Sequence, residues 1–485
     1  MRIKFINLLL FFTSIVLGGD VSHAAHTHDH SLPIYSIIPF IGILLSIAFI
    51  PLISAKFWHN NFGKISAFWA LLFLIPFFIY TSFNVAMYEL LHVLVLEYIP
   101  FIMLLLSLFV ISGGIRLKGT LVGTPLLNTF LIFIGTLLAS WMGTTGASML
   151  LIRPLIRANN YRKYKIHTMV FFIFLVANIG GSLTPLGDPP LFLGYLNGVD
   201  FFWTTSAMLF PMVITVFILL IIYFIIDSYF YNKREFKTIK VLAHEKKLGI
   251  EGGFNFLLIL VVIFSVLISG MWKPNISMPS IFGLHLEFQN ILRDILLLVV
   301  SITSWRLTPK VIREKNSFTW FPIVEVAKLF AGIFITIVPA ISILREGKDG
   351  ALAFIVNSVN NTNGEPINFM YFWLTGILSS FLDNAPTYLV FFNIAGSESP
   401  GNIIISDYLM NYIPGTLLAI SLGAVFMGAM TYIGNAPNFM VKSIAEENYI
   451  KMPSFFGYMG WSLMILIPVF LFISFIFFNF NIFIQ

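Results

Sequence analysis

The sequence contains no cysteine among its 485 residues, and only 10% of its residues are charged. Without cysteine the chain has no disulfide, no thiolate metal ligand and no cysteine nucleophile. In a soluble globular protein about a quarter of all residues are charged, whereas 58% of the residues of this chain are hydrophobic. Its long apolar runs also lack the alternation of apolar and polar residues that an outer-membrane barrel requires. The composition therefore predicts an all-α polytopic membrane protein.

The N-terminus has the pattern of a secretory signal peptide. Arg2 and Lys4 precede an apolar run at residues 5–17 and a small-residue ending, which predicts removal of residues 1–24. An uncleaved first helix is the alternative, although the run is short for a membrane span. The His-rich segment 25–30 is expected to be a solvated tail, with metal scavenging as the alternative.

About ten apolar runs are close to the ~20 residues that a helix needs to cross a bilayer. They lie at 34–54, 65–84, 93–112, 166–197, 202–227, 254–271, 288–305, 321–344, 411–440 and 457–480. Two further segments, 121–157 and 366–396, are long enough for two short limbs and have polar centres at 140–148 and 379–387. Irregular backbone at membrane depth is tolerated where it is buried in protein or faces water. We therefore predict two re-entrant hairpins with these polar centres at their tips.

The basic residues indicate orientation. If the N-terminus starts outside and neither hairpin crosses, most of the 28 Lys and Arg residues fall on one side. The positive-inside rule makes that side the cytoplasm, so both termini are expected outside, in the bacterial inner membrane. The excess of basic residues then gives no reason to expect a nucleic-acid partner. The basic stretch 231–253 is predicted to be a cytoplasmic linker between two transporter repeats, 34–230 and 254–485.

A motif that breaks helices occurs twice within apolar runs. Residues 184–192 read TPLGDPPLF and residues 431–439 read TYIGNAPNF, which share the pattern T-x-[LI]-G-[DN]-x-P-x-F. Proline removes a backbone donor and interrupts a helix, so each motif predicts a broken helix. In each half an apolar helix opened by a glutamate, Glu97 or Glu325, precedes a hairpin and then a broken helix. Together with the charge pattern, this order predicts inverted-topology repeats, with the binding site at the breaks.

Polar residues within the predicted membrane region gather at the hairpin tips and the breaks. Small hard cations take oxygen ligands, and unwound helices expose carbonyls that can bind them. Half-helix N-termini instead suit an anion, so this arrangement by itself permits either kind of site. The candidate ion-binding residues are Thr144, Thr145, Asn178, Thr184, Asp188, Asp383, Asn384, Thr387, Thr431 and Asn435, and Asn438 lies in the same second break.

Asp188 and Asp383 favour a cation. Neither has a Lys or Arg nearby in sequence, and an anion carrier would avoid two negative charges facing its substrate. An unpaired carboxylate in a dry site tends to keep its proton, so it could exchange that proton for a metal ion. We predict that Asp188 and Asp383 bind Na+ or Li+ in one shared site, with side-chain oxygens of the threonines, Asn384 and Asn435 completing it. A structural helix cap is the alternative for each aspartate.

These motifs resemble those of the ion transporter superfamily, especially the stretch Asn178-Ile-Gly-Gly-Ser-Leu-Thr-Pro-Leu-Gly-Asp-Pro-Pro-Leu-Phe together with Leu382-Asp-Asn-Ala-Pro-Thr. Within it the chain looks most like the NhaD-type sodium:proton antiporters and their citrate-transporter-like relatives. The resemblance covers nearly everything after residue 34. It implies a scaffold domain, a transport domain of hairpins and broken helices, a homodimer and elevator-like alternating access. Dicarboxylate:sodium symporters of this superfamily carry Ser-Asn-Thr at both hairpin tips, whereas these tips read Gly-Thr-Thr-Gly and Asp-Asn-Ala-Pro-Thr, which weakens the case for dicarboxylate binding.

Na+/H+ antiport is thus the leading expectation, with Na+ and H+ as transported ions and no resident cofactor. Cation-coupled transport of citrate or another carboxylate is the alternative, and arsenite or other oxyanion efflux is a weaker one. An intramembrane hydrolase is disfavoured, because no His accompanies either aspartate at catalytic spacing, so no enzyme activity is expected. Arg293 and Asp294 are expected to satisfy each other, and His167 is expected at the membrane interface.

Overall fold

The structure is a computed structural model that describes residues 32–119, 121–233, 248–274, 276, 278, 280–347, 350–361, 363–401 and 403–479. The predicted signal peptide, the His-rich tail and most of the linker lie outside these residues. Within them, helices dominate, and the two named strands, β1 (Arg116–Lys118) and β2 (Gly249–Glu251), pair antiparallel. Arg116 and Glu251 form an ion pair of 2.8 Å across this pair, and the hydrogen bond from Arg116 lowers the pKa of Glu251.

In the described part of the chain, eight helices are long and apolar enough to cross a membrane, or up to nine if one bent pair counts as a span. The chain is therefore an all-α polytopic membrane protein. Seven of the ten predicted spans correspond to these long helices, while the run 254–271 forms a shorter helix of 17 residues. The runs 166–197 and 411–440 are interrupted in the middle, as the repeated motif predicts. The eight are Ile34–Ile53, Lys56–Tyr80, Phe83–Ser112, Pro125–Met142, Trp203–Asn232, Phe288–Leu307, Phe321–Arg345 and Phe455–Asn479.

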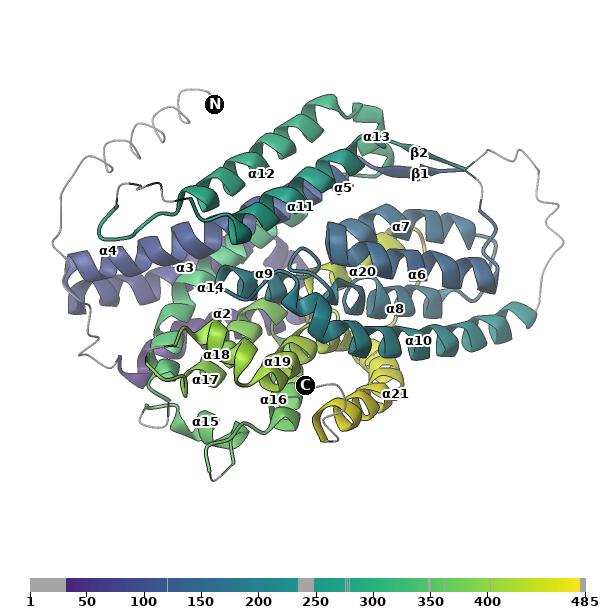
Figure 1. Ribbon diagram of the computed structural model, residues 1–485. Coiled ribbons are helices and arrows are strands. Elements are labelled where there is room, and N and C mark those ends of the chain that lie inside the picture. The colour runs from purple at the N-terminus through teal and green to yellow at the C-terminus, as the bar shows by residue number, and fades with distance from the viewer. Residues whose placement is uncertain are drawn as a thin grey trace.

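One group of helices packs around α5 (Ile99–Ser112) and α14 (Phe321–Arg345). Helices α11 and α12 pack beside α5, and α2 and α3 pack against α14, as the upper and left parts of Figure 1 show. Apolar residues cover most sides of these helices, because both lipid and protein neighbours are apolar. The group consists of η1 (Ile34–Ile37), α2 (Ile38–Ile53), α3 (Ala55–Tyr80), α4 (Phe83–Leu91), the π-helical η2 (His92–Tyr98), α5 (Ile99–Ser112), α11 (Asn255–Met271), α12 (Phe288–Leu307), α13 (Lys310–Lys315) and α14 (Phe321–Arg345).

The second group contains the two predicted hairpins and the two broken helices. The hairpin α6–α7 packs on the first broken helix and the hairpin α16–α17 on the second. The elements are α6 (Pro125–Met142), α7 (Thr144–Ala158), α8 (Ile166–Leu175), η3 (Ile179–Ser182), α9 (Pro189–Leu196), α10 (Trp203–Asn232), α15 (Ala353–Val359), α16 (Asn368–Phe381), α17 (Asn384–Gly396), α18 (Ile405–Asn411), α19 (Pro414–Met427), η5 (Gly428–Met430), α20 (Ala436–Glu447), α21 (Phe455–Ser474) and the π-helical η6 (Phe475–Asn479).

The two hairpins turn by different means. Between α6 and α7 the chain turns at Gly143, whose φ of 78° is accessible to glycine and strained for other residues. Between α16 and α17 it turns at Leu382 and Asp383, and the Asp383 carboxylate caps α17 by accepting a hydrogen bond of 3.1 Å from the Ala385 amide. Each turn leaves a helix N-terminus at the tip of its hairpin.

Equivalent hydrogen bonds join each hairpin to the broken helix of the same half. The Thr184 hydroxyl donates to the main-chain carbonyl of Ser140, and the Thr431 hydroxyl donates to that of Ser380. Each serine hydroxyl donates in turn to a main-chain carbonyl just before the break, at 2.5 Å in the first half and 3.0 Å in the second. Backbone groups freed by breaking a helix inside a membrane need such partners. The threonine that begins the repeated motif therefore anchors each break to its own hairpin.

The motif glycines bring two stretches of backbone into contact. A Cβ atom added to Gly187 would lie 2.1 Å from the carbonyl oxygen of Gly181, and one added to Gly434 would lie 2.7 Å from that of Gly428. Real Cβ atoms do not approach oxygen so closely, so both positions require glycine. The two breaks thus fold back on themselves in the same way, although their relation across the membrane stays a prediction.

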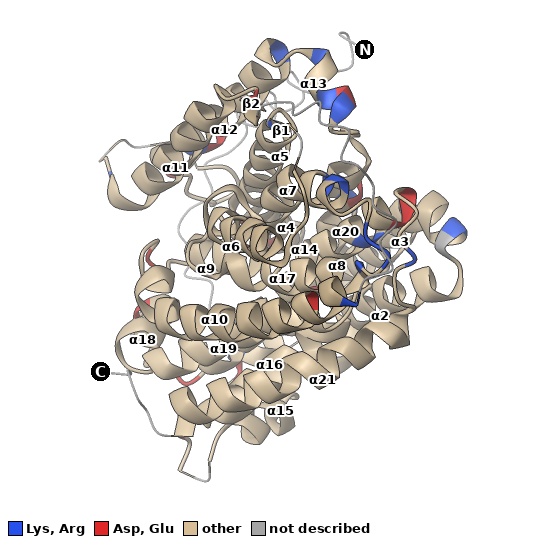
Figure 2. Ribbon diagram, turned by 90° about the vertical axis from the view of Figure 1, so that its right-hand side faces the viewer, with Lys and Arg blue, Asp and Glu red and all other residues tan. Residues whose placement is uncertain are grey.

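Basic residues gather at one end of the helices. Figure 2 views the right-hand side of Figure 1 face on, and its blue segments lie at α13, at the start of α3 and beside α8 and α20. By sequence, Lys56 lies at the start of α3, Lys310 and Lys315 lie in α13, and Lys442 lies in α20. The positive-inside rule would place such ends in the cytoplasm, and this orientation stays a prediction.

Candidate ion-binding site

Four helix N-termini converge on one buried carboxylate. Thr144 is the first residue of α7, Asp188 directly precedes α9, Asn384 is the first residue of α17, and Asn435 directly precedes α20. Two of these helices start at hairpin tips and two at breaks, so both halves of the chain contribute. Helix N-termini carry partial positive charge and favour an anion. The anion that they meet in this protein is the Asp188 side chain.

Asp188 accepts hydrogen bonds from the other three residues. Its Oδ1 accepts from Thr144 Oγ1 at 3.1 Å and from Asn435 Nδ2 at 3.0 Å, and its Oδ2 accepts from Asn384 Nδ2 at 2.5 Å. The side chain is buried, with 2% of the residue exposed. These donors stabilise a carboxylate that has no Lys or Arg partner in the described part of the chain. The structure thereby brings together Thr144, Asp188, Asn384 and Asn435, four of the predicted ion-binding residues.

A chain of side-chain amides extends from this carboxylate. Asn435 donates to Asn178 Oδ1 at 3.2 Å, and Asn178 donates to Asn438 Oδ1 at 2.6 Å. The sequence places Asn438 in the second break but assigns it no role in the site. Asn438 lies three residues after Asn435, on the first turn of α20, and this spacing could have indicated that it belongs to the site.

The remaining predicted residues lie around the site without bonding to Asp188. Thr184 and Thr431 hold the hairpin carbonyls, and Thr387 donates to the main-chain carbonyl of Asp383 at 3.0 Å. Thr145 lines the adjacent cavity.

Asp383 occupies a different position from Asp188. It is partly buried, caps α17 and directly precedes Asn384, whose amide binds Asp188. It does not line the cavity beside Asp188. The cap that we considered as an alternative role is therefore present, and a shared site for both carboxylates stays a prediction.

A cavity with room for water, about 80 Å³ in volume, lies next to Asp188 between the two groups of helices. Its walls come from α5 and α14 on one side and from the first hairpin tip, the first break and α20 on the other. No Lys, Arg or His is among the described residues that line it. Polar groups reach it chiefly at Thr144, Thr145 and Asp188, while Leu104, Phe192, Ile323 and Met440 are among its apolar lining residues.

A cage of several acidic or imidazole ligands was not found in the described part of the chain: there, no group of three or more His, Cys, Asp or Glu side chains could hold a metal ion. A monovalent cation does not need such a cage, because carbonyl, amide and hydroxyl oxygens can bind it beside one carboxylate. The residues around Asp188 supply oxygens of these kinds.

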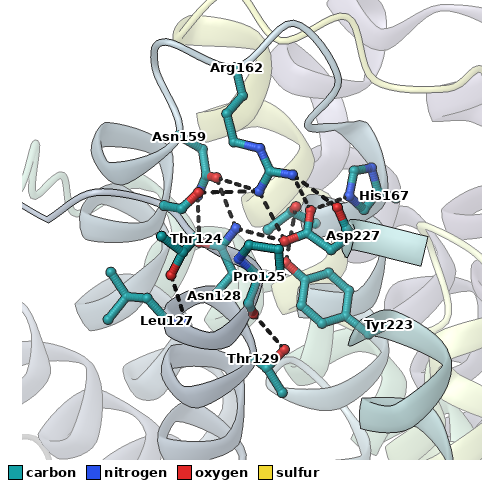
Figure 3. Close-up of polar contacts among 12 residues, drawn as sticks. Thr124, Pro125, Leu127, Asn128, Thr129, Asn159, Arg162, His167, Tyr223 and Asp227 are labelled. Atoms are coloured by element: carbon teal, nitrogen blue, oxygen red, sulfur yellow. Dashed lines mark hydrogen bonds and ion pairs between the residues drawn. The ribbon is translucent and has the colours of Figure 1, made fainter. Parts of the chain in front are cut away.

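A second buried polar cluster lies where the first hairpin meets α8 and α10 (Figure 3). The fully buried carboxylate of Asp227 binds Arg162 through two guanidinium nitrogens, at 2.5 and 2.9 Å, and lies 2.7 Å from His167 Nε2. Asn128, near the start of α6, donates to Asp227 at 3.1 Å and to Asn159, at the end of α7, at 2.9 Å. Both limbs of the hairpin are thereby tied to α10, and His167 is buried at its helix end.

Three further charged residues within spans, Arg293, Asp294 and Glu325, have ordinary partners. Arg293 Nε and Asp294 Oδ1 lie 2.8 Å apart, which confirms that they satisfy each other. Glu325 accepts a hydrogen bond of 3.1 Å from the Trp58 indole.

The fold and this site together define a polytopic helical membrane protein with a buried, polar binding site at two broken helices, the form expected of a transporter. The chain belongs to the family described as "Putative citrate transport", whose pattern it matches over residues 29–478. Comparison with curated proteins gave no match. The family agrees with the citrate-transporter-like resemblance and with a role in transport in place of catalysis.

Proposed function

We propose that this protein is a secondary Na+/H+ antiporter of the bacterial inner membrane. The observation that carries the proposal is the position of Asp188 at the meeting point of four helix N-termini. Such a point favours an anion, and here the protein supplies that anion itself. A substrate that enters beside it meets a carboxylate and a cavity whose described lining residues include no Lys, Arg or His, which suits a cation and opposes a carboxylate anion.

In this proposal Asp188 is alternately protonated and bound to Na+ or Li+. The proton leaves when the cation arrives, because the two compete for the same carboxylate oxygens. Asp383 contributes the second negative charge from the neighbouring hairpin tip. The Asn384 side chain supports cation binding at this site, because its buried Oδ1 has no hydrogen-bond partner among the described residues. An unpaired buried oxygen is costly, and a bound cation would satisfy it.

In this proposal, alternating access comes from movement of one group of helices against the other. The cavity lies between them, so a sliding movement of the hairpins and breaks along α5 and α14 would carry Asp188 from one side of the membrane to the other. In the predicted topology the C-terminal end of α5 and the N-terminal end of α14 lie near the cytoplasm. The cavity extends to Phe109 and Pro322 at those ends, so we assign this structure to an inward-facing state, in a protein that we expect to be a homodimer.

Everted membrane vesicles provide the first test. Addition of Na+ to respiring vesicles that contain the protein should restore the fluorescence of a quenched pH probe, because protons leave as Na+ enters. Na+ binding to the purified protein should weaken as the pH falls, since protons compete for the carboxylate. Na+ binding that does not change with pH would contradict antiport and favour symport.

The family description favours cation-coupled transport of citrate as the second candidate. In that mechanism the helix N-termini would bind the carboxylates of citrate, and Asp188 or Asp383 would hold the coupling Na+. Accumulation of radiolabelled citrate in proteoliposomes under a Na+ gradient would support it. Proton movement without citrate would instead support the antiporter.

A further inference from the structure

The orientation of one buried amide is fixed by main-chain carbonyls. Asn438 Nδ2 donates to the carbonyl oxygens of Gly428 and Thr431, both at 2.8 Å. If the amide were turned over, its oxygen would face two other acceptors. Its Oδ1 must therefore point the opposite way, where it accepts a hydrogen bond of 2.6 Å from Asn178 Nδ2.

The fixed orientation of Asn438 in turn fixes the orientations of the Asn178 and Asn435 amides. Asn178 Nδ2 also donates to the carbonyl of Ile173 at 2.8 Å, so both of its hydrogens are committed and its Oδ1 faces Asn435. Asn435 Nδ2 lies 3.2 Å from that oxygen, 3.0 Å from Asp188 Oδ1 and 3.3 Å from the carbonyl of Ala177. A reversed Asn435 would place its own oxygen against three acceptors. Asn435 is therefore held with its N–H groups towards Asp188.

Asn384 is not held in this way. Its Nδ2 donates to Asp188 Oδ2 at 2.5 Å, while its fully buried Oδ1 has no partner in the described part of the chain. Among the described residues, Asp188 is the hydrogen-bond partner that orients this amide. A cation that neutralises Asp188 would allow Asn384 to turn and present its oxygen.

We propose that Asn438 and Asn178 are positioning residues of the ion site. Through them the Asn435 amide is fixed as a donor to Asp188, which leaves Asn384 as the amide whose oxygen binds the transported cation. This inference rests on the proposed cation transport. It also replaces the expectation that Asn435 contributes an oxygen ligand.

The test is a double-mutant cycle measured by binding of ²²Na+ to the purified protein. Asn435→Ala and Asn438→Ala should each raise the Kd for Na+ at least about tenfold, the effect expected for one hydrogen bond to a charged group. Because Asn438 acts through Asn435, the double variant should bind within about twofold of Asn435→Ala. Additive effects would show that Asn438 does not act through Asn435 and would overturn the proposal. If Asn438→Ala does not fold, Asn178→Ala enters the same cycle.

Asn316→Ala is a matched control. Asn316 Nδ2 also donates to two main-chain carbonyls, those of Gly113 and Ile115, at 3.0 and 2.8 Å, and it is buried away from the site. Its replacement should leave the Kd for Na+ within about twofold, since only the local hydrogen bonds are lost. An equal increase in Kd in this variant would show that the Asn438 effect is general destabilisation and would overturn the proposal.

Selectivity tests the role of Asn384. Asn384→Ala should change the ratio of the Kd values for Li+ and Na+, because a direct ligand senses ion size. Asn435→Ala should raise both values in proportion. A change of ratio in Asn435→Ala without one in Asn384→Ala would overturn the assignment. Wild-type binding of Na+ without proton exchange would refute antiport and leave this cycle interpretable.

Discussion

Asn384 donates a hydrogen bond of 2.5 Å to Asp188 although 196 residues separate them in the chain. The bond joins the tip of the second hairpin to the break of the first half. The proposed ion site therefore forms only when both halves are folded against each other. In the proposed mechanism, a movement that carries the site must move both hairpins together.

The charge of Asp383 can be removed while its structural role is kept. Asparagine caps helices about as well as aspartate, so Asp383→Asn should fold normally and retain the start of α17. We expect it to abolish Na+-dependent dequenching in everted vesicles, because one of the two proposed carboxylates is lost. Exchange at the wild-type rate would show that Asp383 is a cap only and that Asp188 acts alone. Asp188→Asn should be inactive in either case.

Because the chain has no cysteine, a single cysteine introduced into the cavity can be labelled specifically with a thiol reagent. We expect Thr145→Cys, which lines the cavity, to react with a membrane-impermeant thiol reagent in everted vesicles and much more slowly in right-side-out cells. The matched variant Thr375→Cys places a thiol at a fully buried position outside the cavity lining and should react in neither. Faster labelling of Thr145→Cys from the outside would reverse the assigned orientation or state.

The buried ion pair between Asp227 and Arg162 should be essential for stability. Asp227→Ala leaves Arg162 and His167 buried without their carboxylate, which we expect to cost about 3–5 kcal/mol. Thermal unfolding in detergent should show a large fall in Tm. Glu251→Ala removes the partner of Arg116 in a more exposed ion pair and should have little effect. Similar Tm values for the two variants would argue against the structural role of the cluster.

The close backbone contact at the breaks should exclude any side chain. Gly434→Ala adds a Cβ atom 2.7 Å from the Gly428 carbonyl, and we expect destabilisation of about 1–3 kcal/mol from overpacking. Gly187→Ala should behave alike in the first half. Gly460→Ala, where a Cβ atom would meet nothing within 4 Å, is the control. Unfolding curves of the three variants give the comparison, and unchanged stability of Gly434→Ala would refute the requirement for glycine.

Local rules were sufficient to predict much of the fold. Membrane helices follow from long apolar runs, because each helix satisfies its own backbone. The breaks at residues 184–192 and 431–439 follow from proline and glycine, whose effects act within a few residues. The turn at Gly143 and the cap at Asp383 are local features of the same kind. Helix ends were predicted less well: the helix predicted at 93–112 begins at Phe83, and the one predicted at 65–84 begins at Lys56.

The sequence by itself determined the class of protein, the two helix breaks and the set of polar residues from which a site could be built. Only the tertiary structure decided how these residues are used. It placed Asp188 among four helix N-termini and Asp383 at a helix cap, although the sequence treats the two as equivalent. It also gave Asn438 a place in the amide chain. The physical reason is that hydrogen-bond direction depends on which acceptors surround each group, and for Asn384 and Asn435 the acceptors come from the opposite half of the chain.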